Sequence, residues 1–181
     1  MTTYDPRSVS NAIIRLAAHY NRPITHLSLQ KVLYFIHGKY LLETGSPLID
    51  GYFEAWPYGP VHPLIYETFK DFGSGPLRVK ATKRNIVSGQ EIDIEEPTSF
   101  EIVSFIAENC LAYLKFSPGR LVDLSHAKNS PWDVVSRQDQ NNRCYGMRIT
   151  NNTIKEYFKY HKISVSDQSI SGDHNEESPP Y

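Results

Sequence analysis

The chain has few cysteines and no long apolar run among its 181 residues. Its two cysteines, Cys110 and Cys144, are too few for a disulfide framework or a four-thiolate zinc site. No apolar run reaches the roughly 18 residues that a membrane-spanning helix needs. The residues from Met1 to Tyr20 also lack the basic and apolar regions of a secretory signal. We therefore expect a cytoplasmic protein with reduced thiols.

The sequence also has little excess charge of either sign. Lys and Arg number 19 and Asp and Glu number 20, which gives a formal net charge of -1. Proteins whose main function is to bind nucleic acid usually carry a strong excess of Lys and Arg over Asp and Glu. Basic and aromatic residues do alternate near the C-terminus, at Arg143, Tyr145, Arg148, Lys155, Tyr157, Phe158, Lys159, Tyr160 and Lys162. We interpret this stretch as an amphipathic helix with a solvated basic face, and we expect no nucleic-acid binding by the chain itself.

Signatures of catalysis and metal binding are missing. No nucleophile elbow, Walker loop, dinucleotide fingerprint, HExxH or CxxC is present. Asp123, Ser125 and His126 have the residue types of a catalytic triad, but on one short helix their side chains cannot line up as orienter, base and nucleophile. None of the seven histidines has metal-ligand spacing. We expect no enzyme, no metal and no cofactor.

What the sequence does contain is helical periodicity, interrupted by turn residues. Its length suits one domain, and the pattern predicts a mainly α fold: a single compact helical domain with a small β-hairpin or short strands. Helices are predicted to start at Asp5-Pro6, Thr25, Pro60, Thr98, Ser117-Pro118, Ser130-Pro131, and Asn151 or Asn152. The alternation in residues 52–56 predicts an extended segment.

The second of these helices, running to Gly45, is predicted to be central. Phe35 and Leu42 lie off its apolar stripe, which indicates burial on more than one side. Gly38 in its middle predicts close approach by another backbone. Gln30 and Lys31 fall on the polar side of this helix.

Two further segments depart from the helical pattern. Residues 74–97 predict a protruding hairpin or loop with its two runs at 77–80 and 91–95. Residues 163–181 contain four acids and no Lys or Arg, and this composition predicts a disordered acidic tail. The expected organisation is thus a helical domain over 1–162 and a tail over 163–181. The tail either solvates the protein or orders on a partner.

Aromatic residues gather near the predicted turns, at Tyr34, Tyr52, Phe53, Trp56, Tyr58, Tyr66 and Trp132. Trp and Tyr are favoured at binding hot spots, but each of these side chains can equally serve the core. Tyr58 stands in a Pro-Tyr-Gly-Pro setting that is typical of a surface loop.

Three motifs together resemble a known family. They are Leu29-Gln30-Lys31-Val32-Leu33-Tyr34-Phe35 followed by Gly45-Ser46-Pro47-Leu48, then Phe53-Glu54-Ala55-Trp56-Pro57-Tyr58-Gly59-Pro60-Val61, then Leu124-Ser125-His126 with Pro131-Trp132. In order and spacing they resemble the Panacea domain of the SocA-like antitoxin family, over about residues 8 to 160. The resemblance implies a mainly helical domain that binds a toxin of a toxin-antitoxin pair directly, with the toxin encoded by the adjacent gene.

The candidate partner-binding residues lie in these motifs: Tyr34, Trp56, Tyr58, Gly59, Pro60, His126 and Trp132. Within this set, we expect Trp56, His126 and Trp132 to build the domain core around the tight Asn129-Ser130-Pro131 turn. Tyr58, the hairpin and exposed helix rims would then supply partner contacts. The alternatives are an adaptor that delivers a toxin to a protease, a regulatory binding protein of phage or prophage origin, an enzyme with an unrecognised site, and a regulator of its own promoter.

Overall fold

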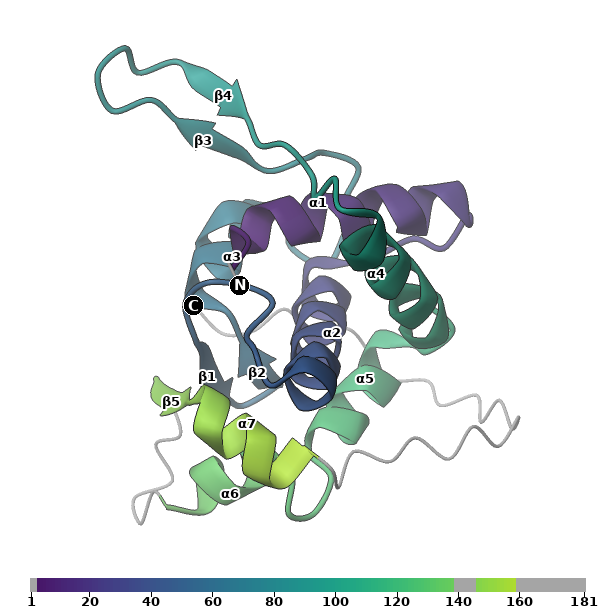
Figure 1. Ribbon diagram of the computed structural model, residues 1–181, viewed down its shortest axis with the longest axis vertical. Helices are drawn as coiled ribbons and strands as arrows, with labels where there is room; N and C mark the ends of the chain where they lie inside the picture. The colour runs from purple at the N-terminus through teal and green to yellow at the C-terminus, as the bar shows by residue number, and fades with distance from the viewer. Residues whose placement is uncertain (1–2, 139–145, 159–181) are drawn as a thin grey trace.

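The computed structural model describes residues 3–138 and 146–158, and its fold is mainly α with short strands, as the sequence predicts (Figure 1). The helices are α1 (Pro6–His19), α2 (His26–Thr44), α3 (Pro63–Phe69), α4 (Phe100–Tyr113), α5 (Pro118–Ser125), α6 (Pro131–Arg137) and α7 (Asn151–Tyr157), with a 3₁₀ turn, η1 (Lys70–Phe72), after α3. The strands are β1 (Phe53–Trp56), β2 (Gly59–Val61), β3 (Thr82–Arg84), β4 (Glu91–Asp93) and β5 (Met147–Ile149). No helix in the described ranges is long and apolar enough to cross a membrane.

Helix α2 lies in the middle of the fold, against α1, α3, α4, α5, α7 and β2 (Figure 1). It begins where the Thr25 hydroxyl accepts a hydrogen bond from the Ser28 amide at 3.2 Å, and it ends at Gly45, whose φ is +73°. Because helices cover it on several sides, its side chains are buried almost continuously from His26 to Leu41. The prediction of a central helix buried on more than one side is confirmed.

The absence of a side chain at Gly38 allows the end of α7 to pack closely against α2. A Cβ built at position 38 would stand 2.2 Å from the ring of Phe158, which follows α7. The prediction of a close approach is confirmed, but the approaching group is an aromatic side chain and not another backbone. The missing side chain of glycine provides the space that the ring fills.

A small antiparallel sheet has the strand order β2-β1-β5. The extended segment predicted at 52–56 forms its central strand, with Ala55 opposite Pro60 on one side and Met147 on the other. The prediction that Pro60 begins a helix is wrong. Pro60 belongs to the edge strand β2, where proline is tolerated, and Pro63 takes the first position of α3.

The predicted helix starts are otherwise mostly right. Asp5, Ser117 and Ser130 each cap a helix whose first residue is proline, and each side chain accepts a backbone N–H. Two predicted caps are wrong. Helix α4 starts after Ser99 and not Thr98, and the Thr150 hydroxyl caps α7 instead of an asparagine. Both errors come from neighbouring residues that are equally capable of capping.

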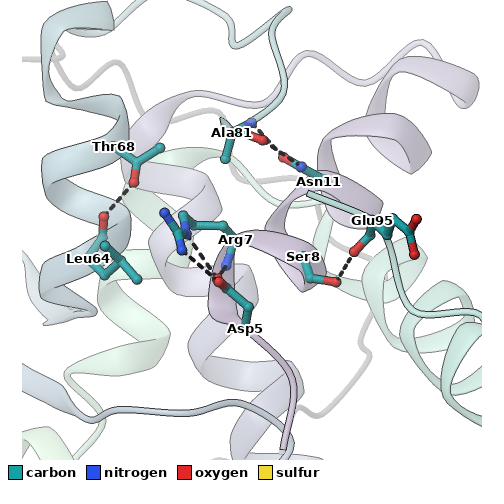
Figure 2. Close-up of polar contacts among 8 residues, drawn as sticks. All are labelled: Asp5, Arg7, Ser8, Asn11, Leu64, Thr68, Ala81 and Glu95. Carbon is teal, nitrogen blue, oxygen red and sulfur yellow. Dashed lines mark hydrogen bonds and ion pairs between the residues drawn. The ribbon is translucent and has the colours of Figure 1, made fainter. Parts of the chain in front are cut away.

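The predicted hairpin is present, and its two strands form the arm, residues 82–93 (Figure 1). Its first strand lies at Thr82–Arg84 and not at 77–80, because Leu77 is buried and its N–H donates to Ile24 O at 2.8 Å. We call residues 80–81 and 94–96, which join the arm to the body, the foot of the arm. Helix α1 holds this foot, because the side chains of Ser8 and Asn11 form hydrogen bonds with the backbone of Glu95 and Ala81 (Figure 2).

Some expectations concern parts of the chain outside the described residues. These are the acidic tail 163–181, Cys144, and Arg143, Tyr145, Lys159, Tyr160 and Lys162 of the basic and aromatic stretch. Two basic residues of that stretch, Arg148 and Lys155, are among the residues that the structure describes. The Arg148 guanidinium stacks 4.0 Å above the Tyr52 ring, and Lys155 Nζ donates to Gly45 O at 2.6 Å. Both side chains are thus engaged within the chain.

Candidate partner-binding site

The three motifs of the sequence meet at the turn between β1 and β2. Trp56 pairs with Gly59, so Pro57 and Tyr58 form the two-residue turn. Behind it stands Lys31 of α2, with no exposed surface, and its Nζ donates to Pro60 O at 3.0 Å. Burial disfavours the ammonium form and lowers the pKa of Lys31 to about 7. The side chain that the periodicity places on the polar side of the helix is an internal anchor for the turn.

Gly59 allows α2 and α5 to close on the turn. Its φ is +94°, and a Cβ there would lie 2.3 Å from Ser125 Oγ and 2.8 Å from Lys31 Cε. Ser125 is fully buried, and its hydroxyl donates to Val122 O at 2.7 Å. A side chain at position 59 therefore meets both an unfavourable backbone conformation and occupied space.

Gln30 fixes the other end of β2. Its Oε1 accepts the His62 N–H at 2.8 Å, and its Nε2 lies 3.4 Å from His62 O. Gln30 is 2% exposed, so the polar side of α2 is buried at this position, as it is at Lys31. The face of α2 opposite its apolar stripe is covered by the sheet, and both polar side chains satisfy backbone groups there.

His126 and Trp132 form the second wall of the site. Their rings stack with centroids 3.6 Å apart and an interplanar angle of 15°. The Trp132 Nε1–H donates to Trp56 O at 2.8 Å, which ties α6 to β1. Burial, and secondly the nearby Lys31 charge, lower the pKa of His126 to about 4, so its ring is neutral at pH 7.

The outer surface of the site is aromatic. The Trp56 Nε1–H donates to Glu54 Oε2 at 2.8 Å, and its ring lies 4.6 Å from that of Tyr66. We call Trp56, Tyr58, Tyr66 and Trp132 the aromatic surface; all four are partly exposed, and Tyr58 is the most open of them at 37%. The anchored turn holds this surface in place.

The candidate residues therefore divide into two groups. Trp56, Tyr58, His126 and Trp132 are accessible to solvent in part. Tyr34, Gly59 and Pro60 are buried, and the Tyr34 ring packs against Phe53 at 5.2 Å and Phe158 at 5.7 Å. The first group is therefore open to contact from outside, whereas the second group lies inside the fold.

The arrangement gives Ser125 and His126 no role as a catalytic pair. The Ser125 hydroxyl donates to a helix carbonyl and is closed off from solvent. His126 Nε2 is buried without a hydrogen-bond partner among the described residues. Within the same residues, no group of three or more His, Cys, Asp or Glu could hold a metal ion.

Sequence reasoning missed Gln30, Lys31 and Ser125 as residues that shape this site. The available signal was their place inside the motifs: two polar residues sit within an otherwise apolar helical segment, and Ser125 stands next to His126. Polar residues in such positions often satisfy buried backbone groups.

The fold and the site describe a mainly α protein whose three separated motifs converge on one anchored turn. The family model that matches it is "Antitoxin SocA-like, Panacea domain", over residues 29–133, a range that contains all three motifs. The chain is also 40% identical to Antitoxin SocA of Caulobacter vibrioides (strain NA1000 / CB15N) over 176 residues, which cover 97% of this chain and 94% of that protein. This chain therefore belongs to the SocA-like antitoxin family, and the resemblance seen in its motifs is confirmed. No solved structure matches it.

Proposed function

We propose that this chain is the antitoxin of a toxin-antitoxin pair and neutralises its toxin by binding it directly in the cytoplasm. The observation that carries the proposal is the 40% identity to Antitoxin SocA over 97% of the chain. We expect the toxin to be a protein encoded by the adjacent gene.

The aromatic surface supplies the first candidate contact. Trp and Tyr bring large apolar area with few rotatable bonds, which is why they dominate binding hot spots. Tyr58 stands at the tip of a turn that Lys31 and Gln30 hold from behind. Such a turn loses little conformational entropy when a partner binds it. In this proposal Tyr34, Gly59 and Pro60 support the contact without touching the toxin.

Neutralisation of this kind requires no reaction by the antitoxin. Covering the active surface of a toxin takes about 800 Å² on each partner, the size of a standard interface. Membership of an antitoxin family fits a non-catalytic role of this kind.

The test is co-expression of the chain with the product of the adjacent gene, scored by growth and by recovery of a complex in size-exclusion chromatography. A Tyr58→Ser variant probes the aromatic surface, and Tyr20→Ser is its matched control because Tyr20 is 40% exposed at the end of α1. We expect rescue and a stable complex with the wild type and the control, and a weaker complex with Tyr58→Ser.

Two results would contradict parts of the proposal. A toxic neighbour that is neither bound nor rescued would reject neutralisation of that toxin. Rescue without any recoverable complex, at concentrations where the wild-type chain is abundant, would reject direct binding and favour a role in toxin turnover.

A further inference from the structure

We propose that the arm is a toxin-binding element that inserts its apolar tip, Ile86 and Val87, into an apolar cleft of the toxin. The proposal deepens the proposed function and rests on it, because it assigns a second contact to the same toxin. The arm stands off α1 at the top of Figure 1, whereas α6, which carries Trp132, lies at the bottom. The arm and Trp132 therefore lie at opposite ends of the molecule in this view.

The tip is the most exposed apolar feature of the described chain. Ile86 is 100% exposed and Val87 is 97% exposed. Phe100, just beyond the foot of the arm, is 83% exposed, while the other exposed large apolar side chains lie between 37% and 43%. Holding two branched apolar side chains fully in water forgoes the burial that normally stabilises such residues. A partner that covers them recovers it.

The tip is also an ordered turn. The Asn85 carboxamide oxygen accepts the N–H groups of Val87 at 2.9 Å and Ser88 at 3.2 Å. The Gly89 N–H donates to Asn85 O at 2.8 Å, and Arg84 Nε donates to Gly89 O at 3.1 Å. These bonds satisfy backbone groups inside the turn while Ile86 and Val87 are displayed outward. The turn is pre-organised for insertion.

The foot of the arm is fixed to the body. Asn11 is fully buried, and its side chain both donates to Ala81 O at 3.0 Å and accepts the Ala81 N–H at 2.7 Å (Figure 2). The Ser8 hydroxyl donates to Glu95 O at 2.6 Å on the returning chain (Figure 2). Lys80 and Arg15 both pair with Glu96. Both ends of the arm are thus held, while its middle projects.

The dimensions of the arm suit a cleft. Strands rise about 3.3 Å per residue, so the three residues from Thr82 to Arg84 carry the turn at 85–89 roughly 10 Å beyond Ala81. No strand of the arm packs extensively on another described element. A tip at the end of a narrow two-stranded projection reaches into a concave surface, which a flat face of the antitoxin cannot do.

The chemistry of the tip selects an apolar cleft. Residues 85–90 contain no ionisable side chain. Arg84 and Glu91 stand opposite each other directly behind the tip and carry opposite charges. The segment therefore offers neither the basic surface that nucleic acid requires nor a charge of one sign for an ionic partner. An apolar pocket with a polar rim is its complement.

Two arm variants and one control test the proposal with the purified toxin encoded by the adjacent gene. Ile86→Ser/Val87→Ser removes the apolar tip. In the second variant an Asn-Gly turn replaces residues 83–92 and joins the paired residues Thr82 and Asp93, so the foot of the arm stays intact. Leu42→Ser is the control, because Leu42 is 42% exposed on the last turns of α2. The melting temperature of each variant shows that it is folded.

We expect both arm variants to melt like the wild type, to raise the Kd for the toxin by about 30-fold or more, and to rescue growth poorly. The control should bind within about twofold of the wild type. Arm variants that bind as tightly as the wild type overturn the proposal. Loss of self-association instead of toxin binding, measured by light scattering, also overturns it and makes the tip a contact between copies. Failure of the wild type to bind rejects the proposed function, and this inference falls with it.

Discussion

At the scale of single residues, Gly59 is the position where the site tolerates least change. Its φ of +94° disfavours any other residue, and a Cβ would overlap Ser125 Oγ at 2.3 Å. Since the strain and the overlap add, we predict that Gly59→Ala lowers the free energy of unfolding by about 2–4 kcal/mol. Urea denaturation at pH 7 measures this loss.

Gly45→Ala is the matched control for that measurement. Gly45 has a φ of +73°, but a Cβ added there would meet no atom within 4 Å, so its substitution carries only the conformational cost of about 1 kcal/mol. Equal losses of unfolding free energy for the two variants would show that Ser125 and Lys31 move aside and make room for the new methyl group at position 59.

Lys31 gives the stability of the protein an unusual dependence on alkaline pH. Its pKa is about 7 in the folded state and about 10.5 in the unfolded chain. Between these values the unfolded state holds the proton that the folded state releases, so stability rises with pH. Below pH 7 both states are protonated, and the cost of burying the ammonium group applies in full.

We predict that the free energy of unfolding contributed by Lys31 increases by about 1.5 kcal/mol from pH 7 to pH 8.5. Lys31→Met fills the same space and removes this rise. Burial raises the pKa of Cys110 and of Tyr113 to about 12, and both groups contribute equally to wild type and variant. Urea denaturation of the two proteins at pH 7, 7.75 and 8.5 gives the difference. Parallel pH profiles would mean that Lys31 keeps its proton throughout this range.

At the scale of elements, the sequence predicts well where helices lie along the chain. It predicts poorly which faces of a helix other elements cover. The apolar residues outside the main stripe of α2 correctly indicate a central helix. They do not indicate that β2 and α5 cover the remaining face, because those elements come from distant parts of the chain. The helical pattern alone therefore places Lys31 and Gln30 on the polar side of α2 without showing that this side is buried. The starts at Asp5, Ser117 and Ser130 are predictable because a cap and a following proline are local signals.

The junction of α7 with α2 yields a prediction about two residues. Gly38→Ala places a Cβ 2.2 Å from the Phe158 ring, which outweighs the gain of about 1 kcal/mol in helix propensity. We expect a net loss of about 1–3 kcal/mol from the displaced ring. Phe158→Leu alone removes aromatic packing, and the double variant loses less than the sum of the two because leucine leaves room for the new methyl group.

A double-mutant cycle in urea measures this coupling. We expect an interaction energy of about 1 kcal/mol between the two positions. Strict additivity would show that the helix shifts as a whole when residue 38 gains a side chain and that the ring is not the obstacle.

At the scale of the whole molecule, an anchored turn and a projecting arm lie at different ends of one scaffold (Figure 1). Buried or half-buried histidines are spread through that scaffold, on α2, between β2 and α3, and at the end of α5. Burial lowers the pKa of His26, His37 and His126 to about 4. Burial also lowers the pKa of His62, so the fold contains at least three neutral imidazoles that the unfolded chain would protonate near pH 6.5.

This arrangement predicts a loss of stability in mild acid. As the pH falls from 6.5 towards 4, the unfolded state binds protons that the folded state does not bind. The free energy of unfolding therefore decreases. His37 is the clearest case, because it is 2% exposed and its Nε2–H donates to Asn151 Oδ1 at 3.0 Å. It should account for about 2 kcal/mol of the decrease between pH 7 and pH 4.5.

His37→Gln is the variant that isolates this effect, since glutamine retains a donor for Asn151 but does not titrate. We expect it to be less stable than the wild type at pH 7, because the shorter amide fills less of the space beside Phe53, and to lose less stability on acidification. Urea denaturation at pH 7, 6, 5 and 4.5 supplies both slopes. If the two proteins lose stability in parallel, protonation at other sites drives the acid transition. The folded state then protonates His37 as readily as the unfolded state does.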